Sequence, residues 1–248
     1  EYGDIELQPG DNISLMLPHE LNTPLVGILG FGEIIHSCAD TLKVEELKEM
    51  GKNILESGLR LQKLIQNFLI FAQLEMISAD PAERMAMRRK ITNKVEQVIT
   101  LAAHAKAEAA KRDDDLQENL TAASLGIAED LLSKIIEELT GNAFKFSQAG
   151  TPVTVSNRIE DEQLIIEVKD EGRGMKAEHI ASVDAYVQFD RKLHEQQGSG
   201  LGLAICRRLT DIHGGTLKVA SQLNRGTTVT VTFPLAPSED PPQAPAAG

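Results

Sequence analysis

Two long segments near the start of the chain, each with a continuous apolar stripe (a seam) at helical spacing, constrain its fold more than any other feature. From Asp11 to about Cys38, apolar residues return to one side of a helix at about 100° per residue; they are Leu17, Leu21, Leu25, Ile28 and Ile35. A second helix, capped by Asp40 or Thr41, carries a heptad seam of Leu47, Ile54, Leu61 and Phe68, interleaved with Met50, Leu64 and Phe71. Two such seams cannot bury each other completely. We therefore expect a homodimer in which two antiparallel helical hairpins form a four-helix bundle.

The rest of the chain mixes helical and strand periods. The seam ends after Gln73, and Pro81 interrupts the segment that follows it. Helical periods then cover 91–110 and 128–146, and alternating apolar residues predict two strand pairs, 151–159 with 163–170 and 216–222 with 226–233. Helices followed by hairpins, with little βαβ alternation, indicate an α+β sandwich of helices on a largely antiparallel sheet.

These patterns divide the chain into five expected regions. They are a connector at 1–10, a helical dimerisation domain at 11–80, a hinge at 81–90, an α+β domain at 91–235 and a disordered, proline-rich tail at 236–248. A chain of 248 residues, 42% of them hydrophobic, has room for two modest domains.

Charge and composition exclude several classes of protein. A net charge of −12 argues against a nucleic-acid binder, which needs a basic face. No apolar run approaches the roughly 18 residues that span a bilayer, and the sequence has no signal peptide, so we expect no membrane contact. The two cysteines are far apart, which favours a reduced, cytoplasmic location. Because the chain begins at Glu1, we expect it to be part of a longer protein.

His19, in the run PHELNTPL, is the first candidate for chemistry. It lies about 160° from the apolar stripe of its helix and should face solvent. A neutral imidazole is a good nucleophile near pH 7, and Glu20 can accept the proton of one ring nitrogen while the other attacks a phosphorus. Thr23 lies one turn further on, where its hydroxyl can orient a water molecule. The alternative for Thr23 is an ordinary helix-surface residue.

Pro18 and Pro24 flank this histidine. Proline in mid-helix removes a backbone donor at a cost of about 3 kcal/mol, so Pro24 predicts a bend just beyond His19. The alternative is a helix that begins near Pro18, but the apolar residues Ile13 and Leu17 before it weaken that interpretation.

A second set of candidates lies in the helix that contains ELTGNAFKFS. Glu138, Asn142 and Lys145 share one side of this helix. The amide oxygen of Asn142 suits a Mg²⁺ ion shared with a triphosphate, and Lys145 can hold phosphate charge. An ordinary polar helix face is the alternative interpretation.

Two glycine-containing strings complete a nucleotide pocket. Asp170 ends the strand QLIIEVKD, where a buried carboxylate can accept a hydrogen bond from the exocyclic amine of adenine. Gly172 and Gly174 allow close approach of the backbone to the base. The string GSGLGL then opens a helix whose free N–H groups can face phosphates, and the stretch before it is typical of a mobile lid.

These strings, in this order, resemble the named sequence motifs, or boxes, of a known protein family. PHELNTPL resembles the H box of the HisKA dimerisation and phosphotransfer domain of sensor histidine kinases, with Asn22 where a basic residue is common. The later strings resemble the N box, the glycine boxes and the terminal GT motif (Gly226 and Thr227) of the GHKL ATP-binding domain. The resemblance covers about residues 11–235. The segment 112–130 departs most from the family pattern, and its strand has no clear position.

The resemblance implies a dimeric four-helix bundle followed by a GHKL (Bergerat) α/β sandwich that binds ATP and Mg²⁺. It also implies phosphorylation of His19 and transfer to an aspartate of a response regulator receiver domain. The catalytic set is His19, Glu20 and Thr23, and the metal ligand is Asn142. The ATP-binding set is Glu138, Asn142, Lys145, Asp170, Gly172, Gly174, Gly198, Gly200, Leu201, Gly202 and Thr227.

The resemblance leaves three readings of the activity to compare. An active kinase is the first reading, and a kinase in which phosphatase activity dominates stays open because Thr23 is competent; the chain would then be the cytoplasmic part of a larger sensor. The alternative is a nucleotide-binding pseudokinase that docks a response regulator. A gyrase-type ATPase needs no histidine-bearing bundle, so we set that reading aside.

Overall fold

The structure is a computed structural model that describes residues 9–175 and 201–236, and the side chains from Glu20 onward within those ranges. The chain divides into two compact units. The first comprises residues up to Ala79 together with 177–208, and the second comprises Asp80–Lys176 and the chain from Leu209. The expected tail and the lid-like stretch before GSGLGL lie outside the described residues.

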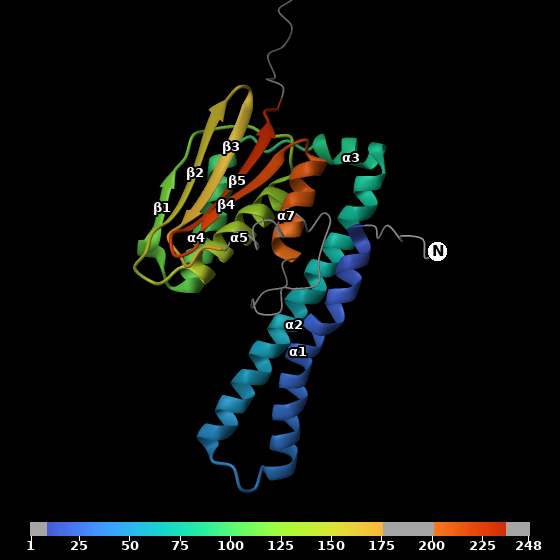
Figure 1. Ribbon diagram of the computed structural model, residues 1–248, viewed down its shortest axis with the longest axis vertical. Coiled ribbons are helices and arrows are strands. Elements are labelled where there is room, and N and C mark those ends of the chain that lie inside the picture. Colours follow the sequence, from blue (N-terminus) through green and yellow to red (C-terminus); the bar gives the residue numbers. More distant parts are fainter. Residues whose placement is uncertain (1–8, 176–200, 237–248) are drawn as a thin grey trace, which may run out of the picture. The chain divides into compact units, whose positions relative to one another are not determined.

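The first unit is built on an antiparallel helical hairpin, α1 (Pro9–Cys38) and α2 (Val44–Ala79) (Figure 1). Helix α1 continues through Pro18 and Pro24 without interruption, so the alternative start near Pro18 is wrong. The bend at Pro24 stays a prediction. Helix α2 continues past Gln73, and Leu74 is buried like Leu64 and Phe71, so the seam is longer than the sequence indicated.

The turn between these helices is capped differently from our expectation. The hydroxyl of Thr41 donates to the Cys38 carbonyl (2.9 Å) and therefore caps the end of α1. The backbone N–H of Lys43 donates to Glu46 Oε2 (2.8 Å), and the Lys43 carbonyl accepts the first α-helical bond of α2. Lys43 is thus the N-cap residue, stabilised by a carboxylate that reaches back from the first turn, and the assignment to Asp40 or Thr41 was wrong.

The second unit opens with a short helix, α3 (Pro81–Arg88), in the segment predicted as a hinge. Asp80 caps it, because Oδ1 accepts from the N–H groups of Ala82 (2.8 Å) and Glu83 (3.4 Å). Pro81 occupies the first helical position, where proline loses no hydrogen bond. It therefore starts a helix in this segment.

A five-stranded sheet follows, in the order β1-β2-β3-β5-β4. Its strands are β1 (Leu116–Asn119), β2 (Val153–Glu160), β3 (Gln163–Asp170), β4 (Thr216–Gln222) and β5 (Gly226–Pro234). Only β1 and β2 pair in parallel, and the other pairs are antiparallel. The last four strands confirm the alternation seen in the sequence. Strand β1 is the strand of segment 112–130 whose position the sequence left open, because its four residues show no alternation of burial.

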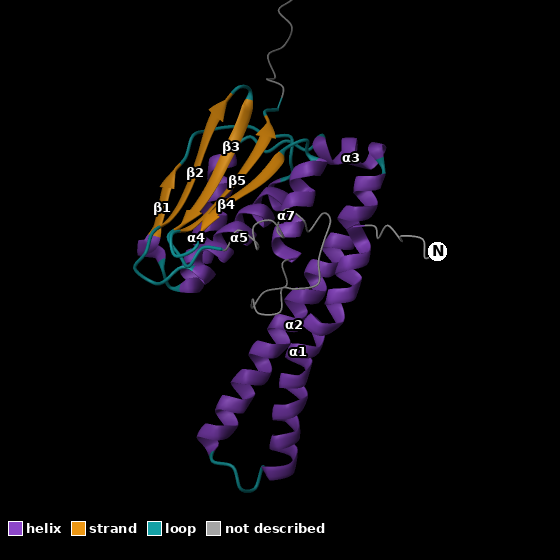
Figure 2. Cartoon of the chain, viewed as in Figure 1, coloured by secondary structure: helices purple, strands orange, loops and turns teal. Residues whose placement is uncertain are grey.

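Helices α4 (Val95–Ala110) and α5 (Glu129–Phe146) lie against one face of this sheet (Figure 2). Between the layers lies a core of fully buried side chains, including Ile99, Ile135, Ile136, Leu164, Ile166, Val231 and Phe233. Alternate residues of β2 and β3 point away from this core, so the sheet is covered mainly on one side. Helix α7 (Leu201–Ile212) precedes β4 in the chain. The expected α+β sandwich is confirmed.

Candidate functional site

Asp170 lies at the C-terminal end of β3 and is only 6% exposed. Its Oδ1 accepts a hydrogen bond from the Gly172 N–H (2.8 Å), and the Thr227 N–H also donates to this carboxyl group. Burial raises the pKa of Asp170, and the two backbone hydrogen bonds oppose that rise. The structure thus holds a desolvated hydrogen-bond acceptor in a fixed orientation, which suits it to accept a hydrogen bond from an amine of a ligand.

The loop that follows Asp170, residues 171–175, packs tightly against two other backbone segments. A Cβ atom on Gly172 would lie 2.2 Å from the Phe146 carbonyl oxygen at the end of α5. Gly174 has φ of +60°, and a Cβ atom there would lie 2.0 Å from the Gln222 carbonyl oxygen at the end of β4. Both glycines therefore permit close backbone approach within the protein, in addition to any approach to a base.

Ser221, which the sequence analysis missed, ties this loop to β4 and β5. Its hydroxyl accepts from the Met175 N–H (2.8 Å), donates to the Gly226 carbonyl (2.9 Å) and lies 3.0 Å from Thr227 Oγ1. In the sequence Ser221 is an ordinary position of an alternating strand. Only the pairing of β4 with β5 brings it beside Met175 and Thr227.

The three candidates on α5 have different surroundings. Glu138 is buried and pairs with Lys134 (2.9 Å), one turn earlier on the same helix. Asn142 is half-buried and Lys145 is exposed, with Nζ 5.1 Å from the centre of the Phe146 ring. The Phe146 carbonyl accepts the Arg173 N–H (3.1 Å), so the end of α5 and the loop 171–175 meet directly.

The catalytic candidates lie on the first unit. His19 and Glu20 are consecutive residues of α1, and the side chain of His19 is outside the described part of the structure. Glu20 Oε2 is buried without a hydrogen-bond partner among the described residues, and the nearest cation is Arg60 of α2, 3.8 Å away. Thr23 follows one turn later and is exposed.

The second glycine string is only partly described. Leu201 and Gly202 are the first two residues of α7, and both are buried. Gly198 and Gly200 lie outside the described residues. The structure thus joins Asp170, Gly172, Gly174 and Thr227 in one cluster and connects it to the end of α5 through Phe146. His19, Glu20 and Thr23 belong to the other unit.

The fold of the second unit is that of an ATP-binding domain. Residues 127–237 match the family described as histidine kinase-, DNA gyrase B- and HSP90-like ATPase, and residues 14–77 match the His Kinase A (phospho-acceptor) domain. With both domains in this order, the chain belongs to the histidine kinases and contains their catalytic core. The predicted family, the fold class and the ATP-binding nature of the second domain are confirmed.

Known proteins agree with this assignment. The chain is 29% identical over 223 residues to a sensor histidine kinase, YvrG, of Bacillus subtilis (strain 168), and 27% identical over 223 residues to the sensor protein SrrB of Staphylococcus aureus (strain NCTC 8325 / PS 47). These alignments cover 88% and 87% of the chain but only 37% and 36% of the two relatives.

Solved structures show the same fold. The histidine kinase AdeS of Acinetobacter baumannii matches 88% of this chain and 98% of its own, with a TM-score of 0.64 at 18% identity. Full-length ShkA, solved in complex with AMPPNP, matches 93% of this chain and 46% of its own, with a TM-score of 0.58 at 25% identity. In the described ranges, no helix is both long enough and apolar enough to cross a bilayer.

Proposed function

We propose that this chain transfers the γ-phosphoryl group of Mg-ATP to His19 and then passes it to an aspartate of a response regulator receiver domain. The observation that carries the proposal is the presence in one chain of two matched units. One is a phospho-acceptor helix bearing His19 and Glu20, and the other is an ATP-binding fold with the buried carboxyl of Asp170 at its strand end. The complex of the similar kinase ShkA with AMPPNP supports a nucleotide in this fold.

The nucleotide would be held by groups of the second unit. Asp170 accepts a hydrogen bond from the adenine amine, and the loop 171–175 lies beside it. Lys145 would hold phosphate charge; the phosphate-binding role of Leu201 and Gly202, at the start of α7, stays a prediction because these residues belong to the first unit. Glu138 supports α5 through its pair with Lys134. Thr227 orients Asp170 through its backbone N–H.

The residues present also fit a magnesium ion. Asn142 offers a hard amide oxygen from a half-buried position. Mg²⁺ favours this arrangement, because it keeps several waters and takes further oxygens from the substrate phosphates. When bound, it neutralises charge that develops on the phosphate oxygens.

The phosphoryl transfer uses the two adjacent residues of α1. A ring nitrogen of His19 attacks the γ-phosphorus, the bond to the bridging oxygen of the β-phosphate breaks, and ADP leaves. Glu20, the adjacent carboxylate, accepts the proton from the other ring nitrogen. The carboxylate of the regulator then attacks the phosphorus, and the P–N bond breaks. Thr23 orients the water that later hydrolyses the phosphorylated regulator.

Phosphate labelling tests this proposal. Purified chain incubated with Mg²⁺ and ATP labelled at the γ position should acquire an alkali-stable, acid-labile label, and His19→Gln should acquire none. His36→Gln serves as the matched control, since it makes the same change at an exposed histidine of the same helix and should keep the label. Nucleotide binding without any label would favour the pseudokinase instead. Label that persists in His19→Gln would contradict the assignment of the acceptor.

A further inference from the structure

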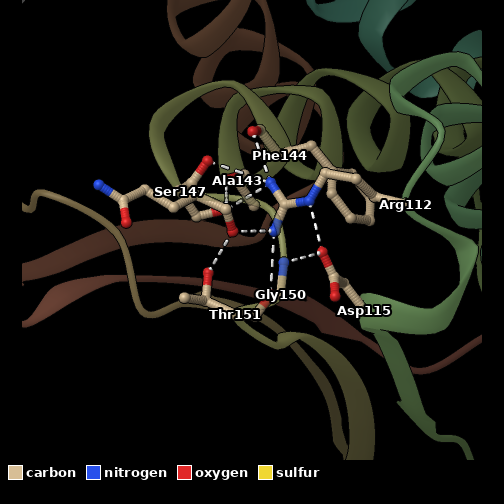
Figure 3. Close-up of polar contacts among 8 residues, drawn as sticks. Arg112, Asp115, Ala143, Phe144, Ser147, Gly150 and Thr151 are labelled. Atoms are coloured by element: carbon tan, nitrogen blue, oxygen red, sulfur yellow. Dashed lines mark hydrogen bonds and ion pairs between the residues drawn. The ribbon is translucent and has the colours of Figure 1, made fainter.

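Arg112 lies between α4 and β1, at the start of the segment that departs most from the family pattern. Its side chain is largely buried, yet every nitrogen of its guanidinium has an acceptor (Figure 3). Nε donates to Asp115 Oδ2 (2.6 Å). The remaining acceptors are carbonyl and hydroxyl oxygens at the end of α5: Phe144 O (2.9 Å), Ser147 O (3.1 Å), Ser147 Oγ (3.0 Å), Gln148 O (2.6 Å) and Thr151 O (2.9 Å).

These acceptors explain why a buried cation is stable here. The last carbonyls of an α-helix have no partner within the helix, and the C-terminal end of the helix carries partial negative charge. A guanidinium has five N–H donors in a planar fork, so Arg112 satisfies the Phe144 carbonyl in the last turn of α5 together with four oxygens of residues 147–151, which follow the helix. Asp115 supplies the counter-charge and also accepts the Gly150 N–H (3.0 Å). We call Arg112, Asp115 and residues 144–151 the Arg112 clamp.

The Arg112 clamp holds the turn that also contacts the nucleotide site. Phe146 lies between two residues bonded to Arg112, and its carbonyl accepts the Arg173 N–H (3.1 Å) of the loop 171–175. The Arg173 guanidinium lies 4.6 Å from the centre of the Phe146 ring. The close fit of Gly172 against the Phe146 carbonyl leaves no room for this turn to shift without displacing the loop.

From this geometry we propose that Arg112 is a positioning residue of the ATP site. It touches no part of the proposed nucleotide position. It fixes the last turn of α5, and thereby sets Asn142 and Lys145 on that helix and the loop that begins at Asp170. The inference depends on the proposed ATP site and assigns a role within it to the segment 112–115. A purely structural arginine would stabilise the fold without a specific effect on nucleotide binding.

The test separates nucleotide affinity from stability in the full chain. Arg112→Met removes the donors and keeps an unbranched side chain. Ile99→Ala, at a fully buried residue of α4, is the control for lost stability, and the thermal midpoints of both variants are measured. Affinity for ATP with Mg²⁺ is measured by calorimetry at a temperature where all variants are folded. We expect Arg112→Met to weaken binding at least about tenfold and Ile99→Ala to change it less than about twofold. Equal affinities in the two variants would overturn the inference.

A second readout reports on the loop itself. Amide hydrogen exchange of Arg173 should become faster in Arg112→Met than in Ile99→Ala, because the acceptor of that amide lies in the clamped turn. Unchanged protection of Arg173 in Arg112→Met would count against the clamp.

A milder variant keeps the inference testable if Arg112→Met does not fold. Arg112→Lys retains the charge but loses the planar fork, so it should weaken binding at least about threefold; wild-type affinity in this variant would overturn the inference. If the unaltered chain bound no nucleotide, the proposed function itself would fail. If the unaltered chain bound normally and both Arg112 variants did too, only the role of Arg112 would be lost.

Discussion

At the scale of single residues, Asp170 combines burial with a proposed role that requires negative charge. Burial raises its pKa, so the carboxylate takes up a proton at a higher pH than an exposed aspartate, whose usual value is 3.8. Affinity for ATP should therefore decline on acidification through that raised pKa. Calorimetric titrations across the acidic range would show this decline, and a profile no different from that of an exposed carboxylate would contradict the assignment.

Asp170→Asn should remove most of this affinity at neutral pH. A hydrogen bond to a charged group contributes about 1.5–3 kcal/mol, which corresponds to a loss of about tenfold to a hundredfold. Asp161→Asn, in the exposed turn between β2 and β3, is the matched control and should bind as the unaltered chain does. Undiminished affinity in Asp170→Asn would remove Asp170 from the site.

His213 makes a second prediction at this scale. It is 4% exposed, its Nδ1 lies 2.7 Å from the Leu209 carbonyl, and its Nε2 has no partner among the described residues. Burial lowers its pKa and the nearby Arg88 charge lowers it further, against an opposing effect of the Leu209 hydrogen bond. The folded-state pKa thus lies below the unfolded value of about 6.5. Stability is then fully present above that value and is lost as pH falls through the folded pKa.

Denaturant unfolding at a series of pH values tests this predicted loss of stability at acidic pH. The free energy of unfolding should fall as the pH drops below about 6.5 and through the folded-state pKa of His213, and His213→Gln should flatten that part of the profile. His104→Gln is the control, because His104 is exposed and pairs with Glu118 at 3.4 Å. A profile that His213→Gln leaves unchanged would show that another group controls the acid sensitivity.

At the scale of elements, the loop 171–175 depends on glycine for two separate reasons. Gly174→Ala would place an alanine in left-handed backbone geometry and a methyl group against the Gln222 carbonyl. Strain of the backbone alone costs about 1–3 kcal/mol, and the contact with rigid backbone adds to it, so we expect the loop to leave its position and nucleotide binding to be lost.

Gly214→Ala separates these two causes. Gly214 also has positive φ (+78°), but a Cβ atom there would meet only the flexible end of the Arg88 side chain, at 3.4 Å. This variant should lose some thermal stability and keep its affinity for nucleotide. Equal loss of affinity in both variants would mean that backbone strain, and not the contact with β4, explains the effect.

At the scale of the whole molecule, the helical hairpin leaves an apolar surface uncovered. Val26 and Leu29 on α1 and Leu55 and Leu59 on α2 are each more than half exposed. Full burial of a leucine side chain contributes about 1.5–3 kcal/mol. In a two-fold symmetric dimer each protomer buries its own copy of the residue, so this free energy is gained twice. This surface is what a dimeric four-helix bundle would bury, and it supports the proposed homodimer.

Leu29→Glu should therefore weaken the dimer by about 3–6 kcal/mol, at least about a hundredfold in the dissociation constant. Sedimentation velocity over a range of concentrations measures this shift. Leu101→Glu, at a more exposed leucine of α4, should leave the association unchanged. An unaltered chain that stays monomeric at high concentration would contradict the proposed dimer.

Much of this molecule follows from local sequence patterns. The helices α1, α2, α4 and α5 and the strands β2 to β5 could be predicted because periods of 3.6 and 2 residues record which side of each element is buried. The order of the motifs indicated the family. Pro81 misled us, because proline at a helix start and proline at a break look alike in sequence.

Only the tertiary structure decided which distant residues support the site. The contacts of Arg112 with residues 144–151, of Ser221 with Met175 and Thr227, and of Gly172 with Phe146 join segments that no local period relates. The placement of β1 depends likewise on pairing with β2. Periodicity reports burial within one element, whereas hydrogen bonds between elements depend on register and packing. The chain's sequence by itself therefore determined its family and most of its elements, and the folded arrangement determined how Asp170 and the loop 171–175 are held.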